Sequence, residues 1–354
     1  MRNEPGASQI TVVQSMDKWG AKGLPSHVMP CFWNRTTITA WLQAKDDQQQ
    51  RLFAAARQAR RSNFGDRVII RGLVEVTNLC RVNCEFCPMR RDNTRGNTIF
   101  ELSEAQILET AAKIKESGIN IVFFQAGEVK KTTQIVGKVL PKIRAMFDGP
   151  VELLLCLGNK SEEEYSYLKN QGATSYILKH ETSDPKLNEK LRHASFANRI
   201  ESLRTLVRTG YKVGTGAIAG LPGQTLESLA DDLLLARDLG THMVSASPFI
   251  PAPDTPLAQH PPGDVNITLN FIAIARLMNP GWLIPSVSAL ETRASGGQSA
   301  GLAAGANVLT VNFTPPVERK NYLIYGKDRY IVRNDHVNEI ISNSGMERMA
   351  SVFV

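Results

Sequence analysis

Residues 71–93 of the chain read RGLVEVTNLCRVNCEFCPMRRDN, an apolar run followed at once by three closely spaced cysteines. The apolar run at 71–77 predicts a strand. Cys80, Cys84 and Cys87 have the spacing C-x-x-x-C-x-x-C, and thiolates are the soft ligands that iron–sulfur clusters select. A structural zinc site normally takes a fourth protein ligand, often from a second C-x-x-C pair, and the sequence has no such pair. The stretch therefore predicts an iron–sulfur cluster whose fourth iron is open.

The composition is that of an ordinary globular enzyme. The 354 residues are 42% hydrophobic and 21% charged, which permits one large α/β barrel or two modest domains. No apolar run is long enough to span a membrane, and the first residues lack the apolar core of a secretory signal. Five cysteines, three of them clustered, are typical of a reducing compartment rather than of a disulfide scaffold. We therefore expect a cytoplasmic location.

The formal net charge of +7 does not by itself identify a partner. The basic residues are scattered, with only short pairs such as Arg60 with Arg61, and no basic tract carries interleaved aromatic residues. A nucleic-acid partner is therefore disfavoured, whereas an acidic partner protein or an anionic substrate stays open.

Apolar segments and helical patterns alternate along most of the chain. Strands are predicted at 71–77, 119–125, 151–157, 175–179, 212–218, 242–248, 282–286 and 307–311. Helices are predicted at 132–146, 161–171, 196–209, 225–239 and 266–278, and one more between a Ser103 cap and Gly118. The alternation predicts an α/β fold, a (β/α)8 TIM-type barrel, with its chemistry at the carboxyl ends of the strands. We expect an N-terminal arm and helices at 1–65, the barrel at 66–332, and a C-terminal helix and tail at 333–354.

The cysteine spacing and four other strings resemble the radical S-adenosylmethionine (SAM) enzymes. The strings are RRDN at 90–93, HETS at 180–183, GLPGQT at 220–225 and SPFIPAPDTPLA at 247–258, so the resemblance covers about 38–325. They are similar to the branch that contains biotin synthase, methylornithine synthase and the radical SAM maturase of iron-only hydrogenase. The resemblance implies a 4Fe–4S cluster on Cys80, Cys84 and Cys87, with SAM on the open iron. Reductive cleavage of SAM then yields a 5′-deoxyadenosyl radical that takes a hydrogen atom from the substrate.

The resemblance also implies which residues contact SAM. The matching positions are Phe86, Ala126, Gly127, Glu128, Glu181, Arg199 and Ile218. Phe86 and Ile218 are expected near the adenine, and the backbone around Gly127 near the methionine amino group. Glu181 falls where a carboxylate binds the ribose hydroxyls, and Arg199 where a guanidinium pairs with the carboxylate of SAM.

The residues alone also allow less specific roles. The cysteines and Phe86 could be buried apolar residues, although their spacing argues against this. Glu128 could be a charge at a helix start, Glu181 a surface acid, and Arg199 an exposed helix residue.

Biotin synthase holds a second cluster with three cysteines and an arginine on its barrel strands. The matching cysteine positions here are near Phe123, Leu154 and Gly214, so a second cluster of that kind is not expected. Cys31 and Cys156 are candidate ligands of any second cluster. An unpaired arm cysteine and a core cysteine are the more common roles for them.

Candidate substrate contacts are few. They are His180 and, in the string SALETR, Ser288, Glu291, Thr292 and Arg293. An acid and a base together would suit a small zwitterion or a carboxylate. A hydrogen-bonded core histidine and a polar loop that closes the barrel are the alternatives.

The sequence therefore leaves three functions open. The first is a radical SAM enzyme that acts on a small amino or carboxylic acid by rearrangement or maturase-like chemistry, with an electron donor such as ferredoxin or flavodoxin. The second is sulfur insertion at an unactivated carbon, as in lipoate or biotin formation. It requires a second cluster or a partner protein, and takes a free or carrier-bound substrate. The third is a non-catalytic iron–sulfur sensor or scaffold. The choice among mutase, lyase and sulfurtransferase stays open.

Overall fold

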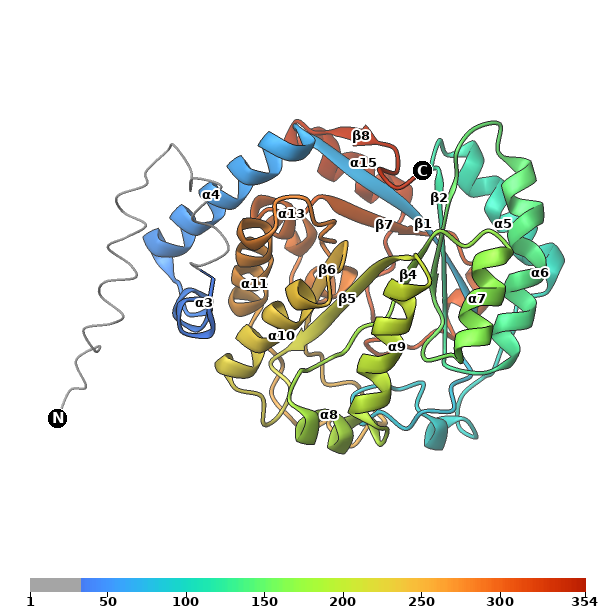
Figure 1. The fold of residues 1–354 in the computed structure, drawn as a ribbon, viewed down its shortest axis with the longest axis horizontal. Coiled ribbons are helices and arrows are strands. Elements are labelled where there is room, and N and C mark those ends of the chain that lie inside the picture. Colours follow the sequence, from blue (N-terminus) through green and yellow to red (C-terminus); the bar gives the residue numbers. More distant parts are fainter. Residues whose placement is uncertain (1–32) are drawn as a thin grey trace.

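A parallel sheet forms the centre of the molecule. The computed structural model describes residues 33–354, and its strands follow the order β6-β5-β4-β3-β2-β1-β7 (Figure 1). The strands are β1 (Arg67–Thr77), β2 (Ile121–Ala126), β3 (Glu152–Cys156), β4 (Ser175–Ile177), β5 (Lys212–Ala219), β6 (Met243–Pro248), β7 (Val308–Asn312) and β8 (Glu347–Met349). Each neighbouring pair is parallel, and the short β8 pairs with the start of β1. This arrangement confirms the predicted α/β class and TIM-type architecture.

The segment 282–286 lies between β6 and β7 and joins them by single bridges. Leu283 forms a parallel bridge with Met243, and Pro285 forms one with Val308. The prediction of a regular strand at 282–286 is wrong, because Pro285 has no N–H with which to extend a ladder. The two bridges still complete the ring of strands, and we call this join the seam.

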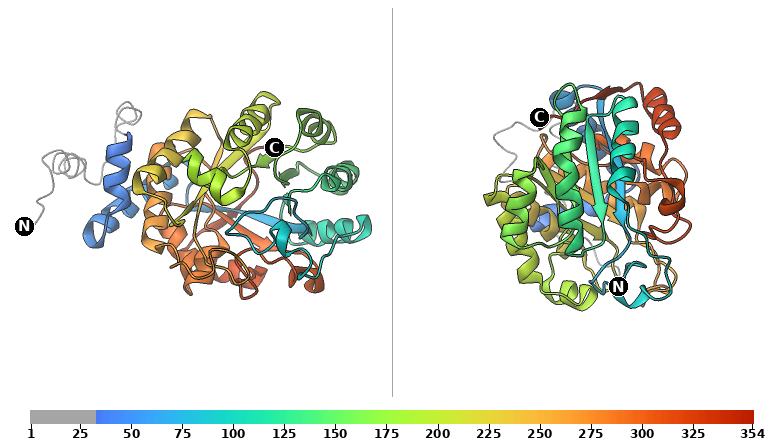
Figure 2. Two further views of the ribbon diagram at one scale, coloured as in Figure 1. Left: turned by 90° about the horizontal axis from the view of Figure 1, so that it is seen from below. Right: turned by 90° about the vertical axis from the view of Figure 1, so that its right-hand side faces the viewer.

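Helices cover the outside of the sheet (Figures 1 and 2). They are α5 (Glu104–Glu116), α6 (Lys131–Met146), α7 (Glu162–Asn170), α8 (Pro185–Arg192), α9 (Phe196–Arg208), α10 (Leu226–Asp238), α11 (Val265–Met278), α12 (Ser288–Arg293), α13 (Gly297–Ala303), α14 (Pro316–Arg319) and α15 (Asn334–Ser344). Ser103 caps α5, as predicted, and forms a capping box with Gln106. Gly118 follows this helix with φ +71°, a left-handed conformation that glycine adopts without steric cost.

Two further helices, α3 (Arg35–Leu42) and α4 (Asp46–Phe64), pack on the outer side of α10 and α11. Asn270 of α11 ties them to the barrel, because its side-chain amide donates to Leu42 O (3.0 Å) and Ala44 O (2.9 Å). Gln49 of α4 in turn donates to Asn270 Oδ1 (3.0 Å). These helices therefore support the side of the barrel.

Apolar side chains fill the barrel interior at the amino ends of the strands. They are Phe64, Ile69, Leu73, Ile121, Phe123, Leu154, Met243, Leu283 and Val308. We call this cluster the floor, and the opposite end, at the carboxyl ends of the strands, the mouth. The C-terminal tail closes the floor from outside: the Ser351 hydroxyl donates to Glu152, and the Phe353 ring packs edge-on against His242. The mouth is the end left for chemistry.

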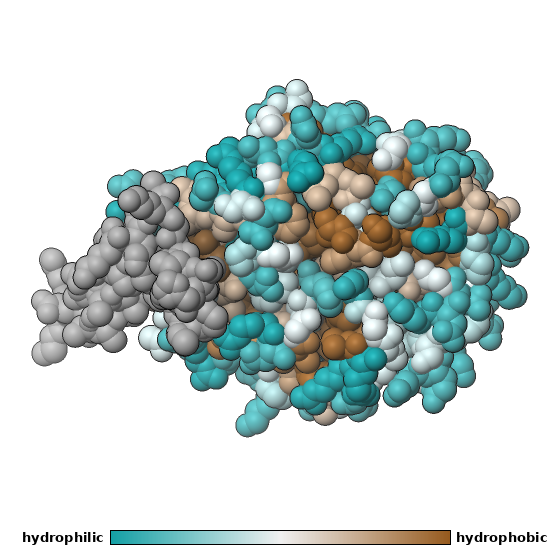
Figure 3. Space-filling view, turned by 45° about the horizontal axis from the view of Figure 1, so that its top comes forward, coloured by the Kyte–Doolittle hydropathy of each residue, from teal (hydrophilic) through white to brown (hydrophobic). Residues whose placement is uncertain are grey.

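The outer surface is mixed in character. Figure 3 brings the β8 side of Figure 1 forward and shows hydrophobic side chains interrupted by hydrophilic ones. Among the helices of residues 33–354, none is long and apolar enough to cross a membrane.

Candidate active site

The loop after β1 carries the three cysteines and folds around Asn83. Asn83 Oδ1 accepts a hydrogen bond from Arg90 Nε (2.8 Å), and Asn83 Nδ2 donates to Asp92 Oδ2 (2.7 Å). Cys87 N donates to Cys84 O (3.2 Å), which tightens the loop between these two thiols. The string RRDN therefore closes the cysteine loop on itself.

All three cysteines line one cavity at the mouth of the barrel. Every residue predicted to contact SAM lines the same cavity: Phe86, Ala126, Gly127, Glu128, Glu181, Arg199 and Ile218. Cys156 also lines it, together with residues that the sequence did not single out, among them Arg192, Lys179, Ser247 and Tyr325. The fold thus brings the predicted cluster ligands and SAM contacts together.

The three thiols lie on one short loop and share one cavity. Within residues 33–354, no group of three His, Cys, Asp or Glu side chains is placed to hold one metal ion. Three thiolates that bind three different irons of one cluster do not have to meet at a single point. Burial raises the pKa of the Cys84 thiol to about 11, and it also raises the pKa values of Cys80 and Cys87. Coordination to iron would favour the thiolate forms, because a metal-bound thiol is deprotonated.

The end of β2 approaches the cysteine loop closely. A Cβ on Gly127 would lie 2.1 Å from Leu79 O, so a larger residue at this position would displace the loop. Gly127 N donates to Thr77 O (3.1 Å), and Glu128 N lies 3.3 Å from Cys80 Sγ as a hydrogen-bond donor. The absence of a side chain at Gly127 thus lets the backbone reach the place where the SAM amino group is expected.

Glu128 is a buried carboxylate enclosed by arginines. Arg81 Nη2 lies 2.9 Å from Glu128 Oε1, while Arg199 and Arg192 lie 3.6 and 3.9 Å from Glu128 Oε2. Arg199 Nη1 also donates to Asn159 Oδ1 (2.5 Å). One carboxylate therefore faces three guanidinium groups, which leaves an excess of positive charge beside the cavity.

Two of these guanidinium groups keep buried nitrogen atoms without a hydrogen-bond partner among the described residues, Arg192 Nη1 and Arg199 Nε. A buried donor without an acceptor is costly, more so when it is charged. The carboxylate of SAM would supply the missing acceptor and balance the charge. The residues present therefore fit SAM as well as the cluster.

Glu181 follows β4 in a left-handed conformation, with φ +70°. Its backbone is fixed to β5, since Glu181 N donates to Gly216 O (3.0 Å) and Ile218 N donates to Glu181 O (2.9 Å). Such a conformation costs about 1–3 kcal/mol, and the two bonds hold it in place. The result is a carboxylate at the mouth that accepts hydrogen bonds only, as binding of ribose hydroxyls requires.

A second polar group in the cavity centres on Lys179. Lys179 Nζ lies 3.1 Å from Ser247 Oγ and 3.2 Å from Glu181 Oε2. Burial is the largest single influence and lowers the pKa of Lys179, but the attractions of Glu181, Tyr325 and Cys156 together raise it above its ordinary value. Lys179 is therefore an ammonium group at neutral pH. Burial raises the pKa of Tyr325, whose phenol contacts Ser247.

Cys156 is a thiol in this same cavity rather than a buried core residue alone. Burial raises its pKa to about 11, so it is neutral at pH 7. Its partner as a candidate second-cluster ligand, Cys31, lies outside the described residues.

The positions that hold a second cluster in biotin synthase are filled here with hydrocarbon. Phe123 and Leu154 belong to the floor. A Cβ on Gly214 would lie 3.0 Å from both Ile177 and Met243, so this position is also closely packed. These three positions therefore carry no thiol and are closely packed.

His180 does not line the cavity. It alternates with Lys179 and Glu181 and points away from the barrel interior, where its Nδ1 lies 2.8 Å from Thr215 Oγ1 and its Nε2 lies 3.3 Å from Asp232 of α10. It is fully buried, which corresponds to the alternative of a hydrogen-bonded core histidine.

Ser288, Glu291, Thr292 and Arg293 form α12, and this helix also stays outside the cavity. The Glu291 carboxylate accepts hydrogen bonds from Gly296 N (2.8 Å) and Gln298 N (2.9 Å) and so stabilises the turn into α13. The polar-loop alternative describes this segment better than a substrate site.

Three cavity residues that the sequence analysis did not single out, Lys179, Arg192 and Tyr325, differ in how well the sequence could have predicted them. Lys179 lies two residues beyond the end of β4 and continues the alternation of Ser175 and Ile177, so strand periodicity predicts that it faces the interior. Arg192 ends a short helix that begins with an Asp184 cap and a proline at its first position, a recognisable start signal. Tyr325 lies in an irregular segment, and no local pattern places it in the cavity.

Comparison with known proteins agrees with this geometry. The model of the radical SAM superfamily matches residues 74–236, which include the cysteine loop, Glu181 and Arg199. The FeFe hydrogenase maturase subunit HydE of Thermotoga maritima is 39% identical over 276 residues, covering 77% of this chain and 78% of the relative. The chain belongs to the radical SAM superfamily. Members of this superfamily bind a 4Fe–4S cluster and SAM, and these are its cofactors.

More distant relatives come from the same branch. The 3-methylornithine synthase of Methanosarcina acetivorans is 28% identical and covers 75% of this chain and 75% of the relative. The biotin synthase of Persephonella marina is 25% identical, covering 68% of this chain and 72% of the relative. The solved structure of methylornithine synthase has a TM-score of 0.78 at 24% identity, over 90% of this chain and 94% of that one. It supports the fold of this radical SAM enzyme.

Proposed function

We propose that this radical SAM enzyme abstracts a hydrogen atom from a small substrate that carries a carboxylate, of the amino- or carboxylic-acid type. The observation that carries the proposal is the shared cavity, in which Lys179 stands beside the expected SAM contacts. A buried ammonium group with hydroxyl neighbours at Ser247 and Tyr325 is suited to a carboxylate. Rearrangement or maturase-like chemistry is supported by relatives named 3-methylornithine synthase and hydrogenase maturase.

Each group at the mouth has a separate task in this proposal. Cys80, Cys84 and Cys87 hold the cluster, which, when bound, supplies the electron that cleaves SAM. Arg192 and Arg199 bind the carboxylate of SAM through their unpartnered N–H groups. Glu181 accepts the ribose hydroxyls. The protein therefore fixes the orientation of SAM from both of its ends.

Apolar side chains in the cavity keep water from the radical. Phe86, Ile177, Ile218, Phe249 and Ile250 line it alongside the polar groups. Exclusion of water protects a reactive species from side reactions.

Sulfur insertion is the second candidate, and the packing opposes it. The three positions that would carry a second cluster are closely packed, and Cys156 is the one remaining described cysteine in the cavity. Iron and sulfide analysis of reconstituted protein distinguishes the two. We expect the iron content of a single four-iron cluster, and a clearly higher value would favour sulfur insertion.

The decisive experiment is anaerobic incubation of the reconstituted enzyme with SAM, a strong reductant and deuterated amino and carboxylic acids. We expect deuterium in 5′-deoxyadenosine from at least one acid, and the labelled position identifies the hydrogen donor. Formation of unlabelled 5′-deoxyadenosine with every acid would contradict the substrate class. Absence of 5′-deoxyadenosine despite an intact cluster would instead favour a sensor or scaffold.

A further inference from the structure

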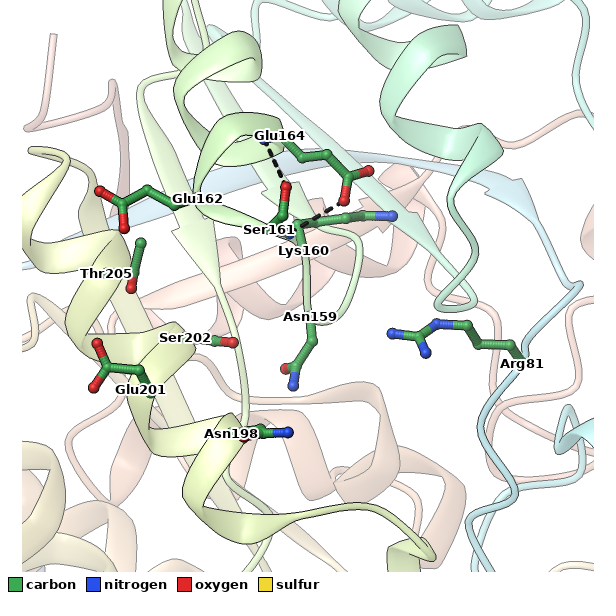
Figure 4. Close-up of a pocket in the computed structure, with 10 residues that line it drawn as sticks. All are labelled: Arg81, Asn159, Lys160, Ser161, Glu162, Glu164, Asn198, Glu201, Ser202 and Thr205. Carbon is green, nitrogen blue, oxygen red and sulfur yellow. Dashed lines mark hydrogen bonds between the residues drawn. The ribbon is translucent and has the colours of Figure 1, made fainter.

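The turn between β3 and α7 connects the cavity at the mouth with a polar pocket on the outside of the barrel. Arg81, Asn159, Lys160 and Asn198 are among the residues that line this outer pocket (Figure 4). The side chain of Asn159 points toward α9, the helix that carries Arg199. Arg199 itself lines the cavity, whereas Asn159 does not. Asn159 therefore lies between the outer pocket and one of the expected SAM contacts.

Asn159 bonds both to the buried carboxylate of Glu128 and to Arg199. Asn159 N donates to Glu128 Oε2 (2.8 Å), and Asn159 Oδ1 accepts a hydrogen bond from Arg199 Nη1 (2.5 Å). Arg199 Nη1 lies 3.6 Å from the same Glu128 oxygen, beyond hydrogen-bond distance. The Asn159 amide thus holds one part of the guanidinium, while Arg199 Nε has no hydrogen-bond partner among the described residues.

The backbone before Asn159 is fixed by close packing. Gly158 has φ +76°, a left-handed conformation, and a Cβ at this position would lie 2.4 Å from Glu128 Oε2. The Gly158 carbonyl oxygen accepts a hydrogen bond from the hydroxyl of the fully buried Tyr176 (2.8 Å). The turn therefore packs directly on Glu128, and it determines where the Asn159 side chain begins.

Removal of the Asn159 amide would leave Arg199 Nη1 beside Glu128 Oε2 at 3.6 Å. A buried charged donor without an acceptor is costly, so we expect the guanidinium to move and close this gap. That movement would draw the guanidinium toward Glu128 and away from the position in which its Nε is free. Asn159 thus decides which N–H groups of Arg199 stay available to a ligand.

We propose that Asn159 is a positioning residue of the SAM site, because its amide oxygen holds the Arg199 guanidinium apart from Glu128 and keeps Nε available to the carboxylate of SAM. Asn159 acts through Arg199 and does not contact SAM. The inference deepens the SAM site proposed above and rests on Arg199 as a SAM contact. It is independent of the substrate class.

The first test is the variant Asn159→Leu, which keeps a similar volume and removes the acceptor. We expect its affinity for SAM to fall about three- to tenfold in the cluster-loaded protein, as measured by equilibrium dialysis, because one hydrogen bond to the guanidinium is lost. Asn159→Asp keeps an acceptor at the same place and should recover most of this affinity. The iron content should equal that of the parent in both variants.

The second test separates positioning from a general disturbance of the turn. In the background Arg199→Met, which has no guanidinium, Asn159→Leu should cause no further loss of SAM affinity, since residues that act as one unit are not additive. A purely structural role would give the same loss in both backgrounds. The matched control is Asn198→Leu, an exposed asparagine of the same outer pocket, which should bind SAM as the parent does.

Two outcomes would overturn the role of Asn159. One is parent affinity for SAM in Asn159→Leu at normal iron content, and the other is an equal loss in the Arg199→Met background. Parent affinity in Arg199→Met alone would instead remove the SAM contact, and the proposal with it. Asn159→Ala should show the same loss as Asn159→Leu, and it replaces that variant if denaturant unfolding of the apoprotein shows that the leucine is not tolerated.

Discussion

The floor and the mouth of this barrel are built by the same strands but treat polar groups in opposite ways. At the floor, the buried Glu152 has both carboxylate oxygens bonded, to the Ser175 and Ser351 hydroxyls, among hydrocarbon side chains. At the mouth, Arg192 and Arg199 retain buried donors without acceptors. The polar groups of Glu152 at the floor are thus satisfied by the chain itself. The buried donors at the mouth need an acceptor from a ligand. Arg71 is an exception at the floor, since its Nε also lacks a partner.

The largest expected effect comes from the mouth, in the variant Cys84→Ala. Loss of one of three ligands should abolish stable cluster assembly, so that bound iron and 5′-deoxyadenosine formation fall to background. Iron analysis and visible absorbance check the first expectation. Cys156→Ala is the control at the same cavity and should retain the iron content of the parent. Loss of iron in this control would show that Cys156 is a cluster ligand.

Removing an unpartnered guanidinium should weaken SAM binding. For Arg199→Gln we expect the affinity of the cluster-loaded protein for SAM to fall roughly 10- to 100-fold, the range for a lost hydrogen bond between charged groups. Equilibrium dialysis with labelled SAM measures it. Arg204→Gln, on the same helix but 60% exposed, is the control and should bind as the parent does. Equal affinities in both variants would remove Arg199 from the SAM site.

A substitution at the floor should lower the stability of the fold and leave SAM affinity almost unchanged. Leu154→Ala is expected to lower the free energy of unfolding by about 2–5 kcal/mol, because it leaves a cavity in a close-packed interior. Denaturant unfolding of the apoprotein measures this loss, and SAM affinity of the loaded protein should change little. Val317→Ala, at a 73% exposed position, is the control and should leave stability almost unchanged. A large loss of SAM affinity in Leu154→Ala would mean that floor and mouth are coupled.

The smallest expected effect is a dependence of stability on pH that arises from Lys160, just outside the mouth. Burial lowers the pKa of Lys160 to about 8 from its ordinary 10.5. Between about pH 8 and 10 the unfolded chain binds more protons at this group, so its contribution to the free energy of unfolding rises with pH. Relative to Lys160→Met, the parent should gain on the order of 1 kcal/mol over this range, allowing for solvent. A constant difference between the two proteins from pH 7 to 10 would contradict this expectation.

The sequence predicted most of the fold because its strands are buried on both sides and its helices carry clear caps. Ser103, for example, caps α5 as predicted, and Gln106 completes a capping box with it. The prediction of a strand at 282–286 failed because an apolar pattern does not show that Pro285 has no N–H for a ladder. The short β8 could not be predicted, since three residues carry too little periodicity.

The site residues also fall into those that the sequence predicts and those that only the folded structure reveals. The cysteine spacing is local and was sufficient to predict the cluster, and the resemblance placed Glu181 and Arg199 in the cavity that the structure contains. Tyr325 reaches this cavity only through tertiary packing of an irregular segment. His180 was misplaced because successive residues of an extended segment face opposite sides, and it lies between Lys179 and Glu181, which face the cavity.

The seam at Leu283 and Pro285 determines where the ring opens. Most neighbouring strands are held by ladders, whereas the seam consists of single bridges to Met243 and Val308. Local opening costs less free energy where fewer bonds break together. In hydrogen–deuterium exchange, amides at the seam should therefore lose protection before those of β1. The strand that carries the cysteine loop is thus held by ladders on both sides, away from the seam.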